Sequence, residues 1–190
     1  MSWSLLFFPK LIPAIMENIH VQAIKFAVSA HHRVNQTYDG APYSLHLTLA
    51  AHYGDVFSHL LPEDEKAPVL AAIWLHDTIE DCRLSYNDIK ASFGEKIAEL
   101  VYAVTNNRGR TRHDRADDDY YRGIVATPYA TFVKLCDRLA NAQYSATMGD
   151  RRMVEVYRAE LDGFLEKLSP AGEADYAPLV ARLRKILEIE

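Results

Sequence analysis

The segment LAAIWLHDTIED (Leu70–Asp81) joins an apolar run directly to four ionisable side chains, His76, Asp77, Glu80 and Asp81. Such groups normally pair, coordinate a metal ion or shift their pKa, because burying a charge without compensation is costly. If the segment is one helix, residues four apart share a face, so His76 lies near Glu80. Repulsion among the three carboxylates raises the pKa of at least one of them unless a cation lies among them. We interpret the cluster as part of a divalent-metal site; the alternative is the solvated end of a buried helix.

A second polar group lies in KLCDRLANA (residues 134–142), at positions i, i+3, i+4 and i+7: Lys134, Asp137, Arg138 and Asn141. On a helix this spacing forms one polar stripe, and the flanking residues are apolar. An aspartate in the stripe would supply the remote carboxylate that an adjacent His-Asp pair needs as a further metal ligand. The alternative is a surface ion pair of Asp137 with Lys134 or Arg138, which contributes little to stability.

A mixed nitrogen and oxygen site also needs another neutral imidazole. Residue spacing alone does not choose among the other histidines of the chain, which are His20, His31, His32, His46, His52, His59 and His113. Each of them, taken alone, is more often a packed or surface histidine than a ligand.

The elements that must position these groups are helical. The apolar spacing predicts a helix start at Ser85, a break at Gly94, and helices over about residues 19–32, 44–53, 65–80, 118–125, 129–147, 151–168 and 173–187. Residues 35–43 and 106–119 are predicted loops. No run alternates with period two, so the fold class is all-α. We expect one domain over residues 1–190, with a core of about 20–168, a C-terminal helix in 170–190 and a packed terminal arm before residue 20.

Bulk composition narrows the function classes. Of the 190 residues, 49% are hydrophobic, which suffices for a sizeable core, and no apolar run is long enough to cross a bilayer. The net charge of −5 argues against a protein that coats nucleic acid through a basic surface. The two cysteines, Cys82 and Cys136, are too few for a disulfide framework and favour a reducing cytoplasm.

Three motifs together resemble a known family. His46, His76-Asp77 and Asp137 match the H…HD…D pattern of the HD-domain metal phosphohydrolases. HDTIED, KLCDRLAN and DGAPYSLH resemble, more narrowly, the hydrolase domain of RelA/SpoT-type alarmone hydrolases, and the likeness extends over about Ala23–Leu168. The third motif is similar to the G-x-P-Y-x-x-H segment of that family, and it selects His46 among the histidines.

The resemblance implies an all-α, manganese-dependent enzyme that removes the 3′-pyrophosphate from guanosine tetra- and pentaphosphate, here as a stand-alone small hydrolase. The products would be the nucleoside 5′-diphosphate or 5′-triphosphate and pyrophosphate. Mn²⁺, or another divalent ion, would be held by His46, His76, Asp77 and Asp137. Water activation and proton transfer would fall to Glu80 and Asp81, without an assignment of which is acid and which is base. Nucleoside contacts would come from Asn141 and Tyr157.

Two regions bear on which nucleotide binds. Thr37 and Tyr38 stand where the family often carries Arg-Lys on the guanine side, so an adenine alarmone becomes credible, with Tyr38 stacking on the base. Arg108 and Arg110 lie in the polar loop and could bind phosphate bidentately. The alternatives are a loop that has merely drifted and a solvated arginine run balanced by nearby aspartates.

The expected partner is a small-molecule nucleotide, with no nucleic acid and no membrane, and the chain would act as a monomer or homodimer. Two other readings remain. One is an HD phosphohydrolase acting on another nucleotide. The second is a hydrolase-type antitoxin, or a nucleotide-binding partner that keeps the fold without catalysis.

Overall fold

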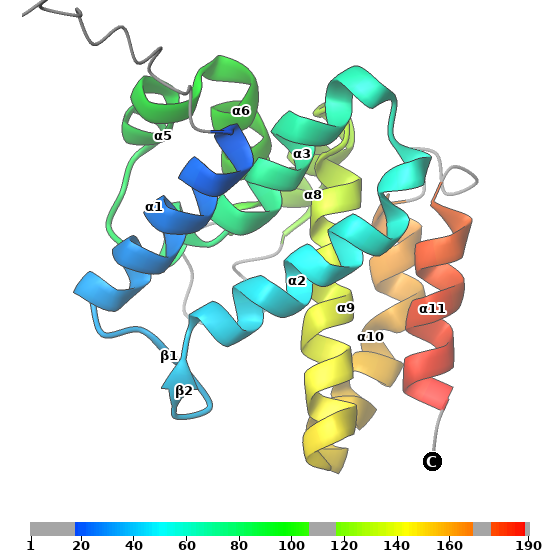
Figure 1. Ribbon diagram of the computed structural model, residues 1–190. Helices are drawn as coiled ribbons and strands as arrows, with labels where there is room; N and C mark the ends of the chain where they lie inside the picture. The colour runs from blue at the N-terminus through cyan, green and yellow to red at the C-terminus, as the bar shows by residue number, and fades with distance from the viewer. Residues whose placement is uncertain (1–17, 107–116, 169–175, 189–190) are drawn as a thin grey trace, which may run out of the picture.

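The computed structural model describes residues 18–106, 117–168 and 176–188, and these residues confirm the all-α class. Within these ranges the chain forms helices and one small hairpin, which lies at the edge of the fold (Figure 1). In chain order the elements are α1 (Ile19–Arg33), β1 (Thr37–Tyr38), β2 (Ala41–Pro42), α2 (Ser44–Phe57), the 3₁₀ helix η1 (Ser58–Leu60), α3 (Glu63–Leu75), α4 (Thr78–Asp81), α5 (Tyr86–Phe93), α6 (Glu95–Val104), α8 (Asp118–Ala126), α9 (Ala130–Met148), α10 (Arg151–Leu168) and α11 (Ala177–Glu188).

Local sequence signals explain where several helices begin and end. Ser85 and Asp88 form the capping box that starts α5, with each side chain bonded to the backbone of the other residue. Gly94 has φ of +85° and ψ of 169°, a conformation that only glycine adopts readily, and it separates α5 from α6. The predicted helix start and break are therefore both confirmed.

The core is arranged around α9, which contacts α2, α3, α6, α8, α10 and α11. Most of its apolar residues are buried, among them Phe132, Val133 and Leu139. Figure 1 shows α2 crossing α9, with α10 and α11 beside it. Because α9 is enclosed on several sides, its polar stripe cannot simply face solvent and must find partners inside the fold.

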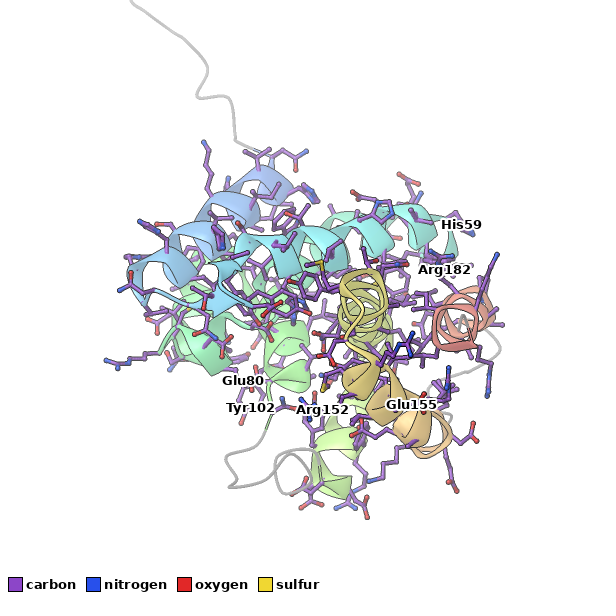
Figure 2. The ribbon with its side chains drawn as sticks, turned by 90° about the horizontal axis from the view of Figure 1, so that it is seen from below. His59, Glu80, Tyr102, Arg152, Glu155 and Arg182 are labelled. Atoms are coloured by element: carbon purple, nitrogen blue, oxygen red, sulfur yellow. The ribbon has the colours of Figure 1, made fainter. Side chains whose placement is uncertain are left out.

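One polar contact ties three of these helices together. Gln143 of α9 accepts hydrogen bonds through Oε1 from the hydroxyl of Tyr53 in α2, at 3.0 Å, and from Arg182 of α11, at 3.0 Å. Figure 2, seen from below, shows Arg182 on the side of α11 that faces α2. This contact adds a polar link to the apolar packing of α2 on α9, the helices that carry His46 and Asp137.

The expectation of one helix over residues 65–80 is wrong. α3 ends at Leu75 and α4 begins at Thr78, so His76 and Asp77 lie at the junction. Two side chains bond to carbonyls that a continuous helix would use: Thr78 Oγ1 donates to Leu75 O at 2.6 Å, and the Nδ1 atom of His76 lies 2.8 Å from Ile73 O. Such local bonds compete with the helical ladder, which is the physical reason for the break.

The predicted loop at residues 35–43 contains a short antiparallel hairpin instead. Thr37 pairs with Pro42 and Tyr38 with Ala41. The two residues between the strands, Asp39 and Gly40, have φ of +50° and +78°. Positive φ at both central positions is typical of the type I′ turn of two-residue hairpins, and the Asp-Gly pair is its usual sequence.

Other sequence-based boundaries differ from the structure by a few residues, the usual uncertainty at helix ends. The predicted terminal arm and most of the predicted loop at 106–119 lie outside the described residues. Within the described ranges, no helix combines the length and apolarity that a membrane crossing requires.

Two glycines provide a test of the helix break. Replacing Gly94 by alanine is expected to lower the free energy of unfolding by about 1–3 kcal/mol, because its backbone lies in a region that side chains disfavour. Gly123→Ala in the interior of α8 is the matched control and should raise it by about 0.5–1 kcal/mol, since an added Cβ meets open space. Urea denaturation at 25 °C measures the free energy of unfolding of both variants. Equal changes in the two variants would show that the backbone conformation of Gly94 does not require glycine.

Candidate active site

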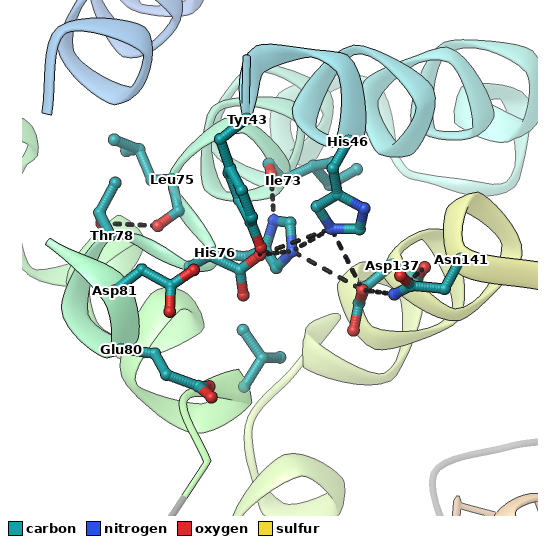
Figure 3. Close-up of polar contacts among 12 residues, drawn as sticks. Tyr43, His46, Ile73, Leu75, His76, Thr78, Glu80, Asp81, Asp137 and Asn141 are labelled. Atoms are coloured by element: carbon teal, nitrogen blue, oxygen red, sulfur yellow. Dashed lines mark hydrogen bonds and ion pairs between the residues drawn. The ribbon is translucent and has the colours of Figure 1, made fainter. Parts of the chain in front are cut away.

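The structure brings the four predicted metal ligands together from three parts of the fold (Figure 3). His46 comes from α2, His76 and Asp77 from the α3–α4 junction, and Asp137 from α9. The Nε2 atoms of the two histidines lie 3.1 Å apart. Asp77 Oδ2 lies 2.8 Å from His76 Nε2 and 3.4 Å from His46 Nε2, and Asp137 Oδ1 lies 3.4 Å from His46 Nε2.

These distances fit one shared cation. Nitrogen and oxygen ligands lie about 2.0–2.2 Å from a small divalent ion, which places neighbouring ligand atoms roughly 3 Å apart. The Nδ1 atom of His76 bonds to the Ile73 carbonyl, which orients the ring so that Nε2 faces Asp77, where it can share a proton with that carboxylate or bind a metal ion. Within the described residues nothing bonds to the buried Nδ1 of His46, so no group outside the cluster fixes its tautomer.

The electrostatics of the cluster lead to the same conclusion. Burial acts to lower the pKa of His46, but hydrogen bonds to Asp137 and Asp77 outweigh it and raise that pKa to about 9. Burial likewise opposes ionisation of Asp77, yet the neighbouring imidazole of His76 holds the pKa of that carboxyl well below its usual value. Protonated imidazoles therefore neutralise the carboxylates here, and a divalent cation would supply the same charge while releasing those protons.

Asp137 has two further partners on its own helix. Lys134 Nζ lies 2.9 Å from Asp137 Oδ2, and Asn141 Nδ2 donates to Asp137 Oδ1 at 2.7 Å. The Lys134 side chain is only 12% exposed, so this ion pair is not the surface pair considered from the sequence. Arg138 pairs instead with Glu160 of α10 at 3.0 Å. Lys134 and Asn141 of the polar stripe thus hold Asp137.

Tyr43 belongs to the site, although the sequence analysis gave it no role of its own. Its hydroxyl donates to Asp77 Oδ2 at 2.6 Å, and its ring stacks on His31 with centroids 4.5 Å apart. Burial and the charge of Asp77 raise the pKa of Tyr43, so the hydroxyl keeps its proton. Its place in DGAPYSLH, three residues before His46, was the available signal, because that spacing puts both side chains on the same side of the α2 start.

The predicted acid pair, Glu80 and Asp81, lies on α4, next to the four predicted metal ligands. Asp81 Oδ2 accepts a hydrogen bond from Gln36 at 3.2 Å, and Glu80 accepts from the backbone and side chain of Asn106, both at 3.3 Å. Burial, with the charges of Asp77 and Glu80, raises the pKa of Asp81 to about 6. This shift agrees with the expectation that crowding raises the pKa of at least one carboxyl.

A cavity of about 350 Å³ connects these groups. It is lined by the acid pair, by His46, Asp77 and Asp137, and by the following residues: Gln36, Tyr43, Asn106, Tyr120, Tyr121, Lys134, Arg138, Asn141 and Tyr157. The sequence predicted that Asn141 and Tyr157 line the substrate cavity. The other residues at the end of that list were not predicted as substrate contacts.

The remaining predicted substrate contacts have different positions. Tyr38 lines a second cavity of about 400 Å³, which shares Asn141 and Tyr157 with the first. Arg108 and Arg110 lie outside the described residues, so their predicted phosphate contacts stay predictions.

Comparison with known proteins defines the family. The family model described as HD domain matches residues 23–165, and the chain belongs to this family. The chain is 30% identical over 167 residues to guanosine-3′,5′-bis(diphosphate) 3′-pyrophosphohydrolase of Aquifex aeolicus, which covers 85% of this chain and 21% of that protein. It is 26% identical over 128 residues to the MESH1 form of the same enzyme from Danio rerio, covering 64% and 66% of the two chains.

A solved structure has the same fold. It is that of a metazoan orthologue of SpoT that hydrolyses ppGpp, with a TM-score of 0.60 and 21% sequence identity over 94% of this chain and 95% of the other. The chain spans only about a fifth of the Aquifex relative and 66% of the zebrafish one.

The raised pKa of Asp81 gives a test of the site without substrate. Its pKa of about 6 exceeds the ordinary 3.8, so the stability it contributes is fully present below pH 3.8 and lost as pH rises through 6. In metal-free protein with EDTA, Asp81→Asn should therefore raise Tm by a few degrees at about pH 7.5 and leave it nearly unchanged at about pH 4. Calorimetry at both pH values measures this. A loss of stability at the higher pH would show that the carboxylate is favourably paired.

Proposed function

We propose that the chain is a metal-dependent 3′-pyrophosphohydrolase of alarmone nucleotides, which converts (p)ppGpp, and by the same chemistry (p)ppApp, to the nucleoside 5′-diphosphate or 5′-triphosphate and pyrophosphate. The observation that carries the proposal is that one imidazole, two carboxylates and a separate acid pair line one cavity, with Nε2 of the buried His76 3.1 Å from that of His46. The relatives named above as (p)ppGpp 3′-pyrophosphohydrolases support the choice of substrate class.

We propose Mn²⁺ as the metal, held by His46, His76, Asp77 and Asp137. A set of imidazole and carboxylate ligands without thiolate suits Mn²⁺ and also accommodates other divalent ions. When bound, such an ion would polarise a phosphoryl oxygen and lower the pKa of a water. The remaining chemistry belongs to side chains of the protein.

The acid pair supplies the proton transfers. The two bonds that change are the one formed between a water oxygen and the phosphorus and the one broken between that phosphorus and the 3′-oxygen. We assign Glu80 as the base that accepts the proton of the attacking water. Asp81, whose pKa is raised to about 6, is the group that can carry a proton near neutrality and pass it to the departing 3′-oxygen.

The other cavity residues would hold the nucleotide. Arg138 lies over the rings of Tyr157 and Phe164, 5.0 Å and 4.4 Å from their centroids, so its guanidinium is held in place at the cavity wall. We propose that it contacts phosphate and that Tyr157 and Asn141 line the nucleoside portion. Arg108 and Arg110 are proposed as further phosphate contacts.

We also propose that the protein acts in the cytoplasm on this small molecule, without nucleic acid. Both of its cysteines are free and buried, which suits a reducing compartment. An acidic net charge of −5 suits a protein whose anionic ligand is recognised locally.

The substrate assignment predicts Mn²⁺-dependent release of pyrophosphate from guanosine or adenosine 3′-pyrophosphates. A coupled pyrophosphate assay should give turnover with these compounds and little with 5′-nucleotides or NADPH, which serve as controls. Comparison of the two bases decides whether Tyr38, in place of a cation, has shifted the preference towards adenine. Hydrolysis of 5′-nucleotides alone would support a different HD phosphohydrolase and reject the proposal.

The residue roles predict a separation of turnover from metal binding. Glu80→Gln and Asp81→Asn should each reduce kcat by about 10²–10⁴-fold and leave Mn²⁺ affinity within a few-fold, because neither is a ligand. Asp137→Ala should lose both, as measured by titration calorimetry with Mn²⁺. Asp162→Asn, on the exposed side of α10, is the control and should change neither. Unchanged turnover in both acid-pair variants would overturn the assignment.

A further inference from the structure

A chain of two hydrogen bonds connects the β1–β2 hairpin to the proposed ligand Asp137. The hydroxyl of Tyr38 donates to Asn141 Oδ1 at 2.8 Å, and Asn141 Nδ2 donates to Asp137 Oδ1 at 2.7 Å. We propose that Tyr38 is a positioning residue, which aims Asp137 at the metal site by fixing the amide of Asn141. The inference rests on the proposed function only in taking Asp137 as a metal ligand.

The chemistry of the three groups fixes the direction of both bonds. A carboxylate paired with an ammonium group only accepts, and Asp137 Oδ2 lies 2.9 Å from Lys134 Nζ. The amide nitrogen of Asn141 must therefore face Asp137, which leaves its oxygen facing Tyr38. The hydroxyl of Tyr38 must then be the donor.

Both oxygens of Asp137 are held, but by different residues. Lys134 binds Oδ2, whereas Asn141 binds Oδ1, the oxygen that lies 3.4 Å from His46 Nε2. Asn141 thus acts on the atom that faces the site. Within α9 its side-chain amide is held only through the nitrogen, by Asp137 Oδ1 and the Asp137 carbonyl, and its terminal torsion has a broad energy minimum, so the amide keeps some freedom. A donor from a separate element removes that freedom.

The position of Tyr38 suits this role. Its ring lies 5.0 Å from the ring of His46 and 4.7 Å from that of Tyr144, so it is packed between the site and α9. A second tyrosine also joins the hairpin to α9: the hydroxyl of Tyr144 donates to Asp39 Oδ2 at 3.0 Å. Tyr144 therefore anchors the same hairpin through Asp39, whereas the side-chain amide of Asn141 bonds to Tyr38 and Asp137, which makes Tyr144 a matched control.

These hydrogen bonds limit the contacts that Asn141 and Tyr38 can make with a nucleotide. Asn141 already donates to the carboxylate and the carbonyl of Asp137, at 2.7 Å and 3.2 Å, so its contact with substrate is limited to accepting through Oδ1. Tyr38 has its proton committed to Asn141 and offers a nucleoside only its ring and an acceptor lone pair.

The test measures Mn²⁺ affinity in the absence of nucleotide. Electron paramagnetic resonance of free and bound Mn²⁺ gives Kd for wild type, Tyr38→Phe, Asn141→Ala, the double variant and Tyr144→Phe. Tyr38→Phe should weaken binding by about tenfold, in the range typical of groups that orient metal ligands. The double variant should bind no more weakly than Asn141→Ala alone, because the effect of Tyr38 passes through Asn141. Tyr144→Phe should stay within about twofold of wild type.

Each other outcome overturns the proposal. Wild-type Mn²⁺ affinity in Tyr38→Phe, with a raised KM for the nucleotide, would make Tyr38 a substrate contact only. Additive losses in the double variant would make its effect independent of Asn141, and an equal loss in Tyr144→Phe would reduce it to general anchoring of the hairpin. Asp137→Ala tests the metal-ligand role of Asp137 separately from the positioning role of Tyr38. Unchanged Mn²⁺ affinity in this variant would show that Asp137 is not a metal ligand.

Discussion

The structure depends on keeping two imidazoles and two carboxylates buried within a few ångströms of one another. No one of these groups would be stable in the interior alone, because burial without a partner is costly for a charge. Together they neutralise one another, which raises the pKa of His46 and lowers that of Asp77 and Asp137. The same arrangement is suited to a dication, so the electrostatic requirement for folding and the requirement for metal binding are met by one geometry.

Holding that geometry requires support from groups that do not bind metal. Tyr43 donates to Asp77, and Lys134 and Asn141 hold the two oxygens of Asp137. Each support is a donor facing an acceptor-only carboxylate, so each favours the ionised form and one orientation. The supports come from the residue that precedes α2 and from α9, and the hydrogen bonds of Gln143 add a polar link between these two helices.

Local features of the fold could be predicted because local contacts decide them. The capping box at Ser85, the break at Gly94 and the extent of α10 all follow from residues within one or two turns. The break at His76 could not be predicted, since apolar spacing alone continues the helix through it. The hairpin at Asp39-Gly40 was missed because its strands are too short to show alternation, although the turn signal was present.

The sequence by itself determined the all-α class, the acid pair next to His76-Asp77 and the polar stripe that carries Asp137, since these depend on residues that lie close together in the chain. The motif resemblance then pointed to His46, whereas spacing left seven histidines open. Only the tertiary structure placed that imidazole within 3.4 Å of Asp137, and only it revealed Tyr43 and Tyr38 as partners of the site. The physical reason is that convergence of residues 46, 76 and 137 depends on how α2, α3 and α9 pack, and side-chain packing over such separations leaves no periodic trace in the sequence.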